Sequence, residues 1–313
     1  KLQAEKVSIL PKEIKILAFL LFFICCSKNT DNEQQISSNS SDSLAYYFSA
    51  TKNKNIPANI RIHSNRRALL LIGKRKNDIS YRNDLYKVAK EFYTLESEKD
   101  LRRTLKIIFE KSIEKKDSMN IARAYNLLGN QNINLFQYDS AYYYLLKSEK
   151  LFTKIKDSLS LGRNYIDKAF VQLYENDYSG CELSCIQALG YYKNFNDRQK
   201  QYDAFNLIGI CSNEQKNYEN ALTYHRRALA TASDYQIITK SHLKANSLNN
   251  IGVVYQSMNN HAEAIKNFKV AILEENLLKD SPSLYAMIKD NLAYSKLKLN
   301  DFDDLPKLFF ESL

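Results

Sequence analysis

Small residues recur about every forty positions through most of this 313-residue chain. Gly or Ala stands at Ala89, Gly129, Ala169, Gly209, Gly252 and Ala293, at intervals of 40, 40, 40, 43 and 41 residues. Twelve residues after each lie Leu101, Ala141, Cys181, Ala221, Ala264 and Leu305, and seven further on lie Ile108, Ser148, Ala188, Ala228, Ala271 and Ser312. Apolar residues fill the gaps at helical spacing. Each period therefore predicts two amphipathic helices joined by a tight turn, and the recurrence predicts an array whose units pack on their neighbours.

Glycine at this phase indicates close contact between paired helices, because Gly inside a helix costs about 1 kcal/mol relative to Ala. We expect these glycines to face alanines on their partner helices: Gly129 with Ala141, Gly209 with Ala221 and Gly252 with Ala264. The chain holds only seven Gly and four Pro, which favours a mostly helical fold over strands and turns. We expect Asp and Ser residues between units to cap the next helix. They are Asp117-Ser118, Asp157-Ser158 and Asp280-Ser281, with Asn196-Asp197 in the equivalent place.

The repeating residues resemble the tetratricopeptide repeat. They are Tyr125-x-x-Leu128-Gly129, Phe205-x-x-Ile208-Gly209 and Leu248-x-x-Ile251-Gly252-x-x-Tyr255, followed on second helices by Ala221 and Ala228, and by Ala264, Phe268 and Ala271. The resemblance implies an all-α, right-handed superhelical solenoid of antiparallel helix pairs. It covers residues 82–313 as about six repeats with the last one truncated, and residues 44–81 are expected to form a degenerate helical N-terminal cap. The units exceed the family's basic length of about 34 residues, as in extended repeats of bacterial sensors and regulators.

The N-terminal segment has a different pattern. An apolar run, Ile16–Ile24, follows Lys12 and Lys15 and ends at Cys25-Cys26; it is shorter than the roughly 20 residues that span a membrane. Residues 1–26 resemble a bacterial lipoprotein signal, which implies lipidation at Cys26 and a membrane anchor; the alternatives are an uncleaved signal or the start of a buried helix. Residues 27–43 are polar and are interpreted as a flexible tether. We therefore expect a cell-envelope location, lipid-anchored or exported.

The partner surface follows from the resemblance, since first helices line the concave face in this family. Three residues before the small position lie Asn126, Asn206, Asn249 and Asp290, and one residue after it lie Asn130, Phe170, Ile210, Val253 and Tyr294. An amide side chain can both donate to and accept from a peptide backbone, so these asparagines predict a ladder that holds a protein or peptide segment. The alternative is that they are ordinary solvated helix positions.

No catalytic or metal motif occurs in the sequence, so we expect neither an enzyme nor a cofactor. Cys181 and Cys185 fall on core positions, which favours packing over redox or metal chemistry, and His225 likewise falls on a core position. The formal charge is +10, with basic residues gathered between Lys52 and Lys76. No nucleic-acid recognition motif accompanies them, so we interpret them as a solvated helix face and expect no nucleic-acid partner.

Two functions from different classes fit these patterns. The first is a non-enzymatic peptide-binding scaffold tethered at the envelope. The second is the sensory N-terminal region of a bacterial sensor histidine kinase or transcription regulator, with its effector domain beyond Leu313.

Overall fold

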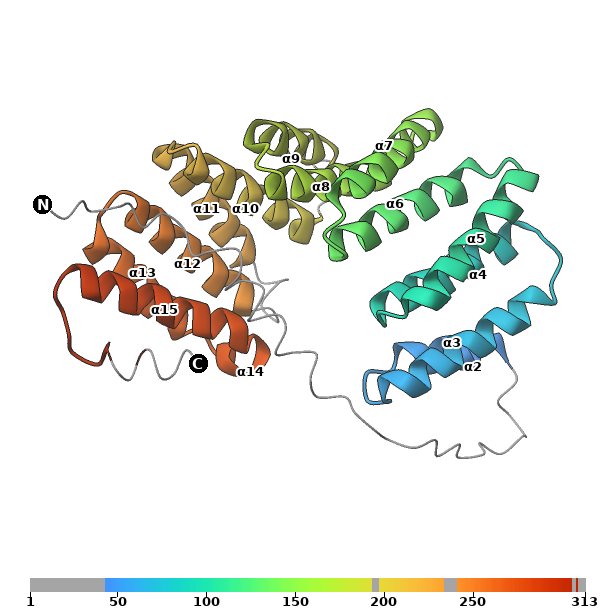
Figure 1. Cartoon of the computed structure of the whole chain (residues 1–313), viewed down its shortest axis with the longest axis horizontal. Helices are drawn as coiled ribbons and strands as arrows, with labels where there is room; N and C mark the ends of the chain where they lie inside the picture. Colours follow the sequence, from blue (N-terminus) through green and yellow to red (C-terminus); the bar gives the residue numbers. More distant parts are fainter. Residues whose placement is uncertain (1–42, 193–196, 234–240, 306–307, 309–313) are drawn as a thin grey trace, which may run out of the picture. The chain divides into compact units, whose positions relative to one another are not determined.

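The computed structural model describes residues 43–192, 197–233, 241–305 and 308. Residues from Leu44 onward form one compact unit, and its described residues contain helices and no strand. The helices are α2 (Leu44–Lys52), α3 (Ala58–Gly73), α4 (Ile79–Thr94), α5 (Glu98–Glu114), α6 (Ser118–Asn134), α7 (Tyr138–Ile155), α8 (Ser158–Tyr174), α9 (Tyr178–Tyr192), α10 (Arg198–Glu214), α11 (Tyr218–Ala232), α12 (Ser241–Ser257), α13 (His261–Ile272), α14 (Leu277–Asp280) and α15 (Pro282–Lys298). Figure 1 shows that they follow one another in chain order as antiparallel pairs. The fold is the predicted all-α solenoid.

The predicted repeat phase is confirmed by burial. All six small residues, from Ala89 to Ala293, are buried. The residues twelve positions later, from Leu101 to Leu305, are buried as well, and so are Ile108, Ser148, Ala188, Ala228 and Ala271. Ser312 and Cys26 lie outside the described residues. The segment before the regular repeats forms the helix pair α2 and α3.

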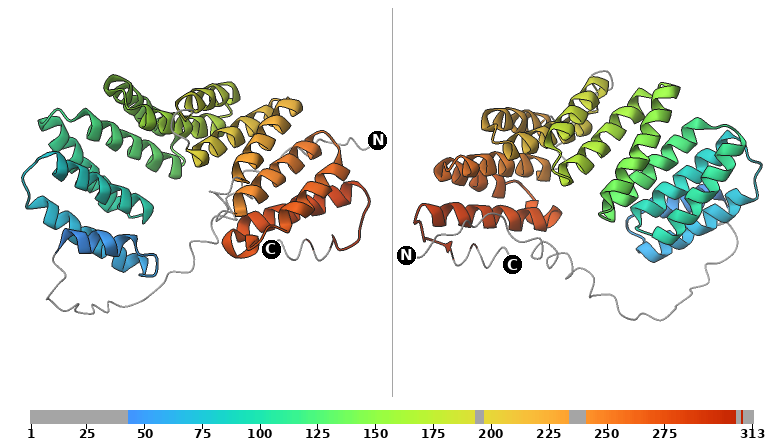
Figure 2. Two further views of the ribbon diagram at one scale, coloured as in Figure 1. Left: turned by 180° about the vertical axis from the view of Figure 1, so that it is seen from behind. Right: turned by 45° about the horizontal axis from the view of Figure 1, so that its top comes forward.

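The first helices of consecutive pairs contact one another directly: α4 with α6, α6 with α8, α8 with α10, α10 with α12 and α12 with α15. Consecutive second helices, from α5 to α13, make at most marginal contact with each other. The first helices therefore form the inner side of the stack, as the two views of Figure 2 also show. We call this side of the stack, formed by α4, α6, α8, α10, α12 and α15, the first-helix face.

A large side chain lies closest to each glycine, where we expected an alanine; only Gly129 also has its expected partner nearby, with the Ala141 backbone oxygen 3.4 Å from an added Cβ. A Cβ on Gly129 would lie 2.7 Å from Leu145, and a Cβ on Gly209 would lie 2.6 Å from the His225 ring. Gly252 packs in the same way against the Phe268 ring. Each of these residues lies four positions after the alanine that we expected, one turn further along the second helix. The missing Cβ therefore makes room for a bulky neighbour, and the alanines are buried beside it.

Three of the four predicted aspartates cap a helix. The carboxylates of Asp117, Asp157 and Asp197 accept hydrogen bonds from the backbone N–H three residues later, at 3.1, 3.1 and 3.2 Å. Asp280 instead ends the short helix α14, and Ser281 precedes α15 without a side-chain cap. Because Pro282 opens α15 and has no N–H, this helix has one unsatisfied backbone donor fewer at its start.

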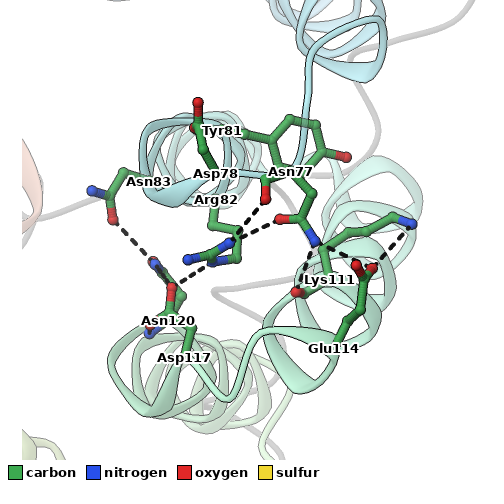
Figure 3. A network of polar contacts seen from close by, with 9 residues as sticks. All are labelled: Asn77, Asp78, Tyr81, Arg82, Asn83, Lys111, Glu114, Asp117 and Asn120. Carbon is green, nitrogen blue, oxygen red and sulfur yellow. Dashed lines mark hydrogen bonds and ion pairs between the residues drawn. The ribbon is translucent and has the colours of Figure 1, made fainter.

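The start of α6 is also tied to α4 by a buried ion pair (Figure 3). The Arg82 Nε donates to Asp117 Oδ2 at 2.6 Å, and both side chains are almost fully buried. Asn120 donates to Asp117 at 2.9 Å and to Asn83 at 3.1 Å. Burial alone would raise the pKa of Asp117, but the hydrogen bonds from Arg82 and Asn120 outweigh it and hold that pKa below its ordinary value.

Candidate functional site on the first-helix face

The predicted site residues all lie on first helices, but they differ in exposure. Asn126, Asn130, Phe170, Asn206, Ile210 and Val253 are partly exposed, Asp290 and Tyr294 are exposed, and Asn249 is only 1% exposed. Tyr294 also contacts His261 through its ring. Asn249 is therefore not accessible to a partner in this structure, while the other predicted residues are.

The predicted asparagines contact the next first helix, two residues before its small position. Asn250 donates to Asn206 at 2.8 Å, and Asn291 donates to Asn249 at 2.9 Å. A longer contact of 3.4 Å runs from Asn249 to Asn250. The four amides thus form one chain across α10, α12 and α15. Much of their hydrogen-bonding capacity joins consecutive repeats, which the sequence did not predict.

Asp167 on α8 is the centre of a second amide cluster. Asn126 donates to its Oδ2 at 2.8 Å, and Asn130 donates to the same atom at 3.0 Å. Protein atoms surround the side chain, yet part of it remains exposed to water. Burial raises the pKa of Asp167, although the two amides and nearby Lys200 act in the opposite direction. Asp167 was not among the predicted site residues. It lies two positions before Ala169, at the position that Asn250 and Asn291 occupy in later repeats.

Aromatic and basic side chains surround this cluster. Tyr86 on α4 lies beneath the Arg123 guanidinium, with 5.4 Å between the charged carbon and the ring centre. The Tyr93 hydroxyl accepts a hydrogen bond from Asn134 at 3.2 Å. Burial raises the pKa of both tyrosines, so both stay protonated at neutral pH. This part of the first-helix face therefore offers hydroxyl, amide, carboxylate and ring surfaces together.

Further along, Lys200 on α10 forms an ion pair with Asp203 at 2.9 Å. Desolvation lowers the pKa of Lys200, but the charge and hydrogen bond of Asp203 together with the charges of Asp167 and Asp197 outweigh it, so the pKa is raised. Arg163 on α8 lies 3.8 Å from Asp197. The first-helix face thus carries both signs of charge, and these groups are already paired within the chain.

The cysteines and His225 lie in the core. Cys181, Cys185 and Cys211 are buried free thiols, and Cys211, on the next first helix, extends the pair that the sequence predicted. Hydrogen bonding between these thiols and burial raise the pKa of Cys181 and Cys211. Burial lowers the pKa of His225 to about 4. Within the described part of the chain, no group of three His, Cys, Asp or Glu side chains is arranged to hold a metal ion.

The basic segment near α3 is partly neutralised by intramolecular contacts. Arg66 pairs with Asp100 at 2.8 Å, and Arg75 pairs with Asp84 at 2.6 Å. Among the described residues, no helix is both long and apolar enough to cross a membrane.

A separate hollow of about 390 Å³ lies where α5 meets α6. Leu105, Phe109, Ile113 and Leu128 supply its apolar lining, and Arg102, Lys106 and Glu110 also line it. Its lining residues come mostly from a second helix, so it is distinct from the first-helix face.

Comparison with known proteins agrees with this architecture. The tetratricopeptide repeat family matches residues 201–272, which span α10 to α13. No curated protein sequence matches the chain. The described residues therefore have a tetratricopeptide-like helical repeat fold, and the family match itself covers the two helix pairs from α10 to α13.

Several solved structures have a similar fold at low sequence identity. The apo form of RapI is 16% identical, with a TM-score of 0.65 over 86% of this chain and 74% of that one. A signal transduction ATPase with a tetratricopeptide repeat sensor, from Pyrococcus horikoshii, is 16% identical with a TM-score of 0.66, over 86% of this chain and 44% of that one. NprR in complex with its cognate peptide NprX is 17% identical with a TM-score of 0.58, over 86% and 76%. At these identities the likeness concerns the fold alone.

Proposed function

We propose that this chain is a non-enzymatic scaffold that binds an extended peptide segment along its first-helix face. The observation that carries the proposal is the row of accessible side chains one residue after each small position. Asn130, Phe170, Ile210 and Val253 come from consecutive first helices and are all partly exposed. Amides and apolar groups in such a row can contact successive residues of a peptide, as repeat proteins do along their inner surfaces.

The amides on this face are suited to a peptide backbone. Asn126 and Asn206 are partly exposed and already oriented by their hydrogen bonds to the next helix. Ordering a mobile side chain on binding costs about 0.5–1.5 kcal/mol in conformational entropy. A side chain that is already oriented avoids part of this cost. The similar fold of NprR, which binds its cognate peptide NprX, supports the same class of ligand here.

A pair of matched substitutions tests the proposal. Ile210→Arg places a charge on the first-helix face, whereas Ile186→Arg places it on the second helix α9, where Ile186 is 49% exposed. A random heptapeptide phage library is panned on the full chain, and a recovered peptide is synthesised with a fluorophore for anisotropy measurements. We expect at least a tenfold loss of affinity for Ile210→Arg and little change for Ile186→Arg. Recovery of no peptide, or equal losses in both variants, would contradict the proposal.

A second candidate is the sensory region of a larger signalling protein. It is supported by the structural likeness to the Pyrococcus horikoshii ATPase, whose repeat sensor belongs to a longer chain. The complete reading frame tests it: a kinase or DNA-binding domain after residue 313 would favour this candidate, and a stop codon shortly after the last helix would favour the free-standing scaffold.

We further propose that Cys26 anchors the chain to a membrane of the cell envelope. The apolar run that ends at Cys25-Cys26 supports this proposal. Metabolic labelling with an alkyne-bearing fatty acid should modify the wild-type chain and leave Cys26→Ala unmodified. Equal labelling of both, or of neither, would rule out the anchor.

A further inference from the structure

Asp167 is surrounded by protein atoms, and no ion pair with a Lys or Arg of the described residues compensates its charge. Asp84, Asp100, Asp117, Glu149 and Asp203 each form an ion pair with Lys or Arg within 2.9 Å. No Lys or Arg of the described residues lies within ion-pair distance of Asp167, whose only partners there are the amides of Asn126 and Asn130. Burying a carboxylate without a cation is costly, so its presence on this face requires an explanation.

The nearby cations are already engaged elsewhere. Lys200 influences Asp167 but is bound to Asp203 at 2.9 Å. Arg163 lies beside Asp197, and Arg123 lies over the Tyr86 ring. None of them forms an ion pair with Asp167.

The carboxylate has one oxygen available. Both amides donate to Oδ2. Oδ1 has no hydrogen-bond partner among the described residues, and it is not one of their buried unpartnered atoms. Two donors on Oδ2 fix the orientation of the group, and Oδ1 keeps some exposure to solvent at a defined position on the first-helix face.

The residues around this oxygen suit a cation. Phe170 lies one helical turn further along α8, on the same side of the helix, and is partly exposed. Tyr93 lies close enough for its titration to be influenced by Asp167. Aromatic rings and a carboxylate together bind ammonium or guanidinium groups well.

We propose that Asp167 is the specificity-determining residue for a cationic group of the bound peptide, namely a Lys or Arg side chain or an amino terminus. The ligand ion pair would supply the positive charge that the free protein lacks at this position. This inference rests on the proposed peptide-binding function and adds the chemical class of one ligand residue.

The test compares three full-length proteins: wild type, Asp167→Asn and Asp203→Asn. Asp203 is the matched control because it lies on the next first helix and already has Lys200 as its partner. The same heptapeptide phage library is panned on each protein. We expect Lys and Arg to be enriched at one peptide position with wild type and Asp203→Asn, and the enrichment to be absent with Asp167→Asn.

One recovered peptide and its variant with Gln at the basic position then complete a double-mutant cycle. We expect the change to Gln to weaken binding to wild type at least tenfold and to leave binding to Asp167→Asn within about twofold, because the ion pair is absent there. An equal loss with both proteins, or peptides without a preferred basic position, would overturn the inference while leaving the peptide-binding function standing. Failure to recover any peptide on wild type would overturn both.

A measurement without ligand separates this role from a structural one. If Asp167 stands uncompensated in the free protein, Asp167→Asn should melt at the same temperature as wild type or higher, since Asn keeps the size and removes the shielded charge. A clearly lower melting temperature would show that the carboxylate serves the fold, and would overturn the inference.

Discussion

Gly209 and His225 provide a sharp test of how the helix pairs pack. A Cβ on Gly209 would lie 2.6 Å from His225 Cε1 and 2.7 Å from both ring nitrogens. These distances are far below van der Waals contact, and His225 is 1% exposed, so the ring has little room to move. Overpacking of this kind typically costs about 1–3 kcal/mol. Replacing Gly by Ala inside a helix contributes about 1 kcal/mol in the opposite direction.

We therefore expect Gly209→Ala to destabilise the wild-type protein by up to about 2 kcal/mol. In a His225→Cys background the same change should stabilise by about 1 kcal/mol, because the ring is gone and only the helix propensity remains. The α8–α9 pair supports this combination, since Ala169 and Cys185 occupy the equivalent positions and are both fully buried. The coupling between the two changes should equal the overpacking cost of about 1–3 kcal/mol.

Urea unfolding followed by circular dichroism measures the free energies of unfolding of the four proteins. Gly190→Ala is the control, because no atom lies within 4 Å of the position that its Cβ would take. It should stabilise by up to about 1 kcal/mol in either background. If Gly209→Ala changes the free energy of unfolding by the same sign and size in wild type and in the His225→Cys background, the packing explanation is wrong.

Three further predictions concern stability. Both side-chain amide atoms of Asn164 are buried without a hydrogen bond, so Asn164→Ala should raise the free energy of unfolding by about 1 kcal/mol; a lower melting temperature would contradict this. Lys216 has a φ of 62°, a conformation that Gly adopts without strain. Lys216→Gly should therefore stabilise the protein by roughly 0.5 kcal/mol, and a lower melting temperature of this variant would contradict the prediction. The depressed pKa of Asp117 contributes stability that is complete above its ordinary pKa of about 3.9 and is lost as pH falls through the folded value. The advantage of wild type over Asp117→Asn in acid unfolding should therefore shrink below about pH 4, and a constant difference would refute it.

The repeat phase was predictable because it depends on spacing within one helix pair. A small residue, a second small or apolar residue twelve positions later and a third after seven more all face the same core, and the structure buries them as expected. The side chain that fills the space above each glycine was not predicted. That requires the relative rotation of two helices, which determines that Leu145, rather than Ala141, lies closest to Gly129.

Contacts between consecutive first helices were harder to predict. The hydrogen bonds that join them span 41 residues from Asn126 to Asp167, 44 from Asn206 to Asn250 and 42 from Asn249 to Asn291. The separation changes because the connections between repeats differ in length. Three equivalent asparagines were visible in the sequence, but their partners were not, since the register between neighbouring repeats is set by packing.

The non-glycine turns explain how seven glycines suffice for so many helix pairs. Positive φ angles occur at Glu96, Lys116, Phe136, Lys156 and Lys216, among others, whereas none of the glycines of the described residues has one. Turns that usually use glycine are here closed by residues with side chains, at a cost of about 1 kcal/mol each. Three of the glycines lie instead where Leu145, His225 and Phe268 press against a first helix. A turn tolerates a strained residue, whereas a helix contact with a large Leu, His or Phe side chain leaves no room for a Cβ. Close packing of these pairs is therefore the stronger requirement on where this sequence places glycine.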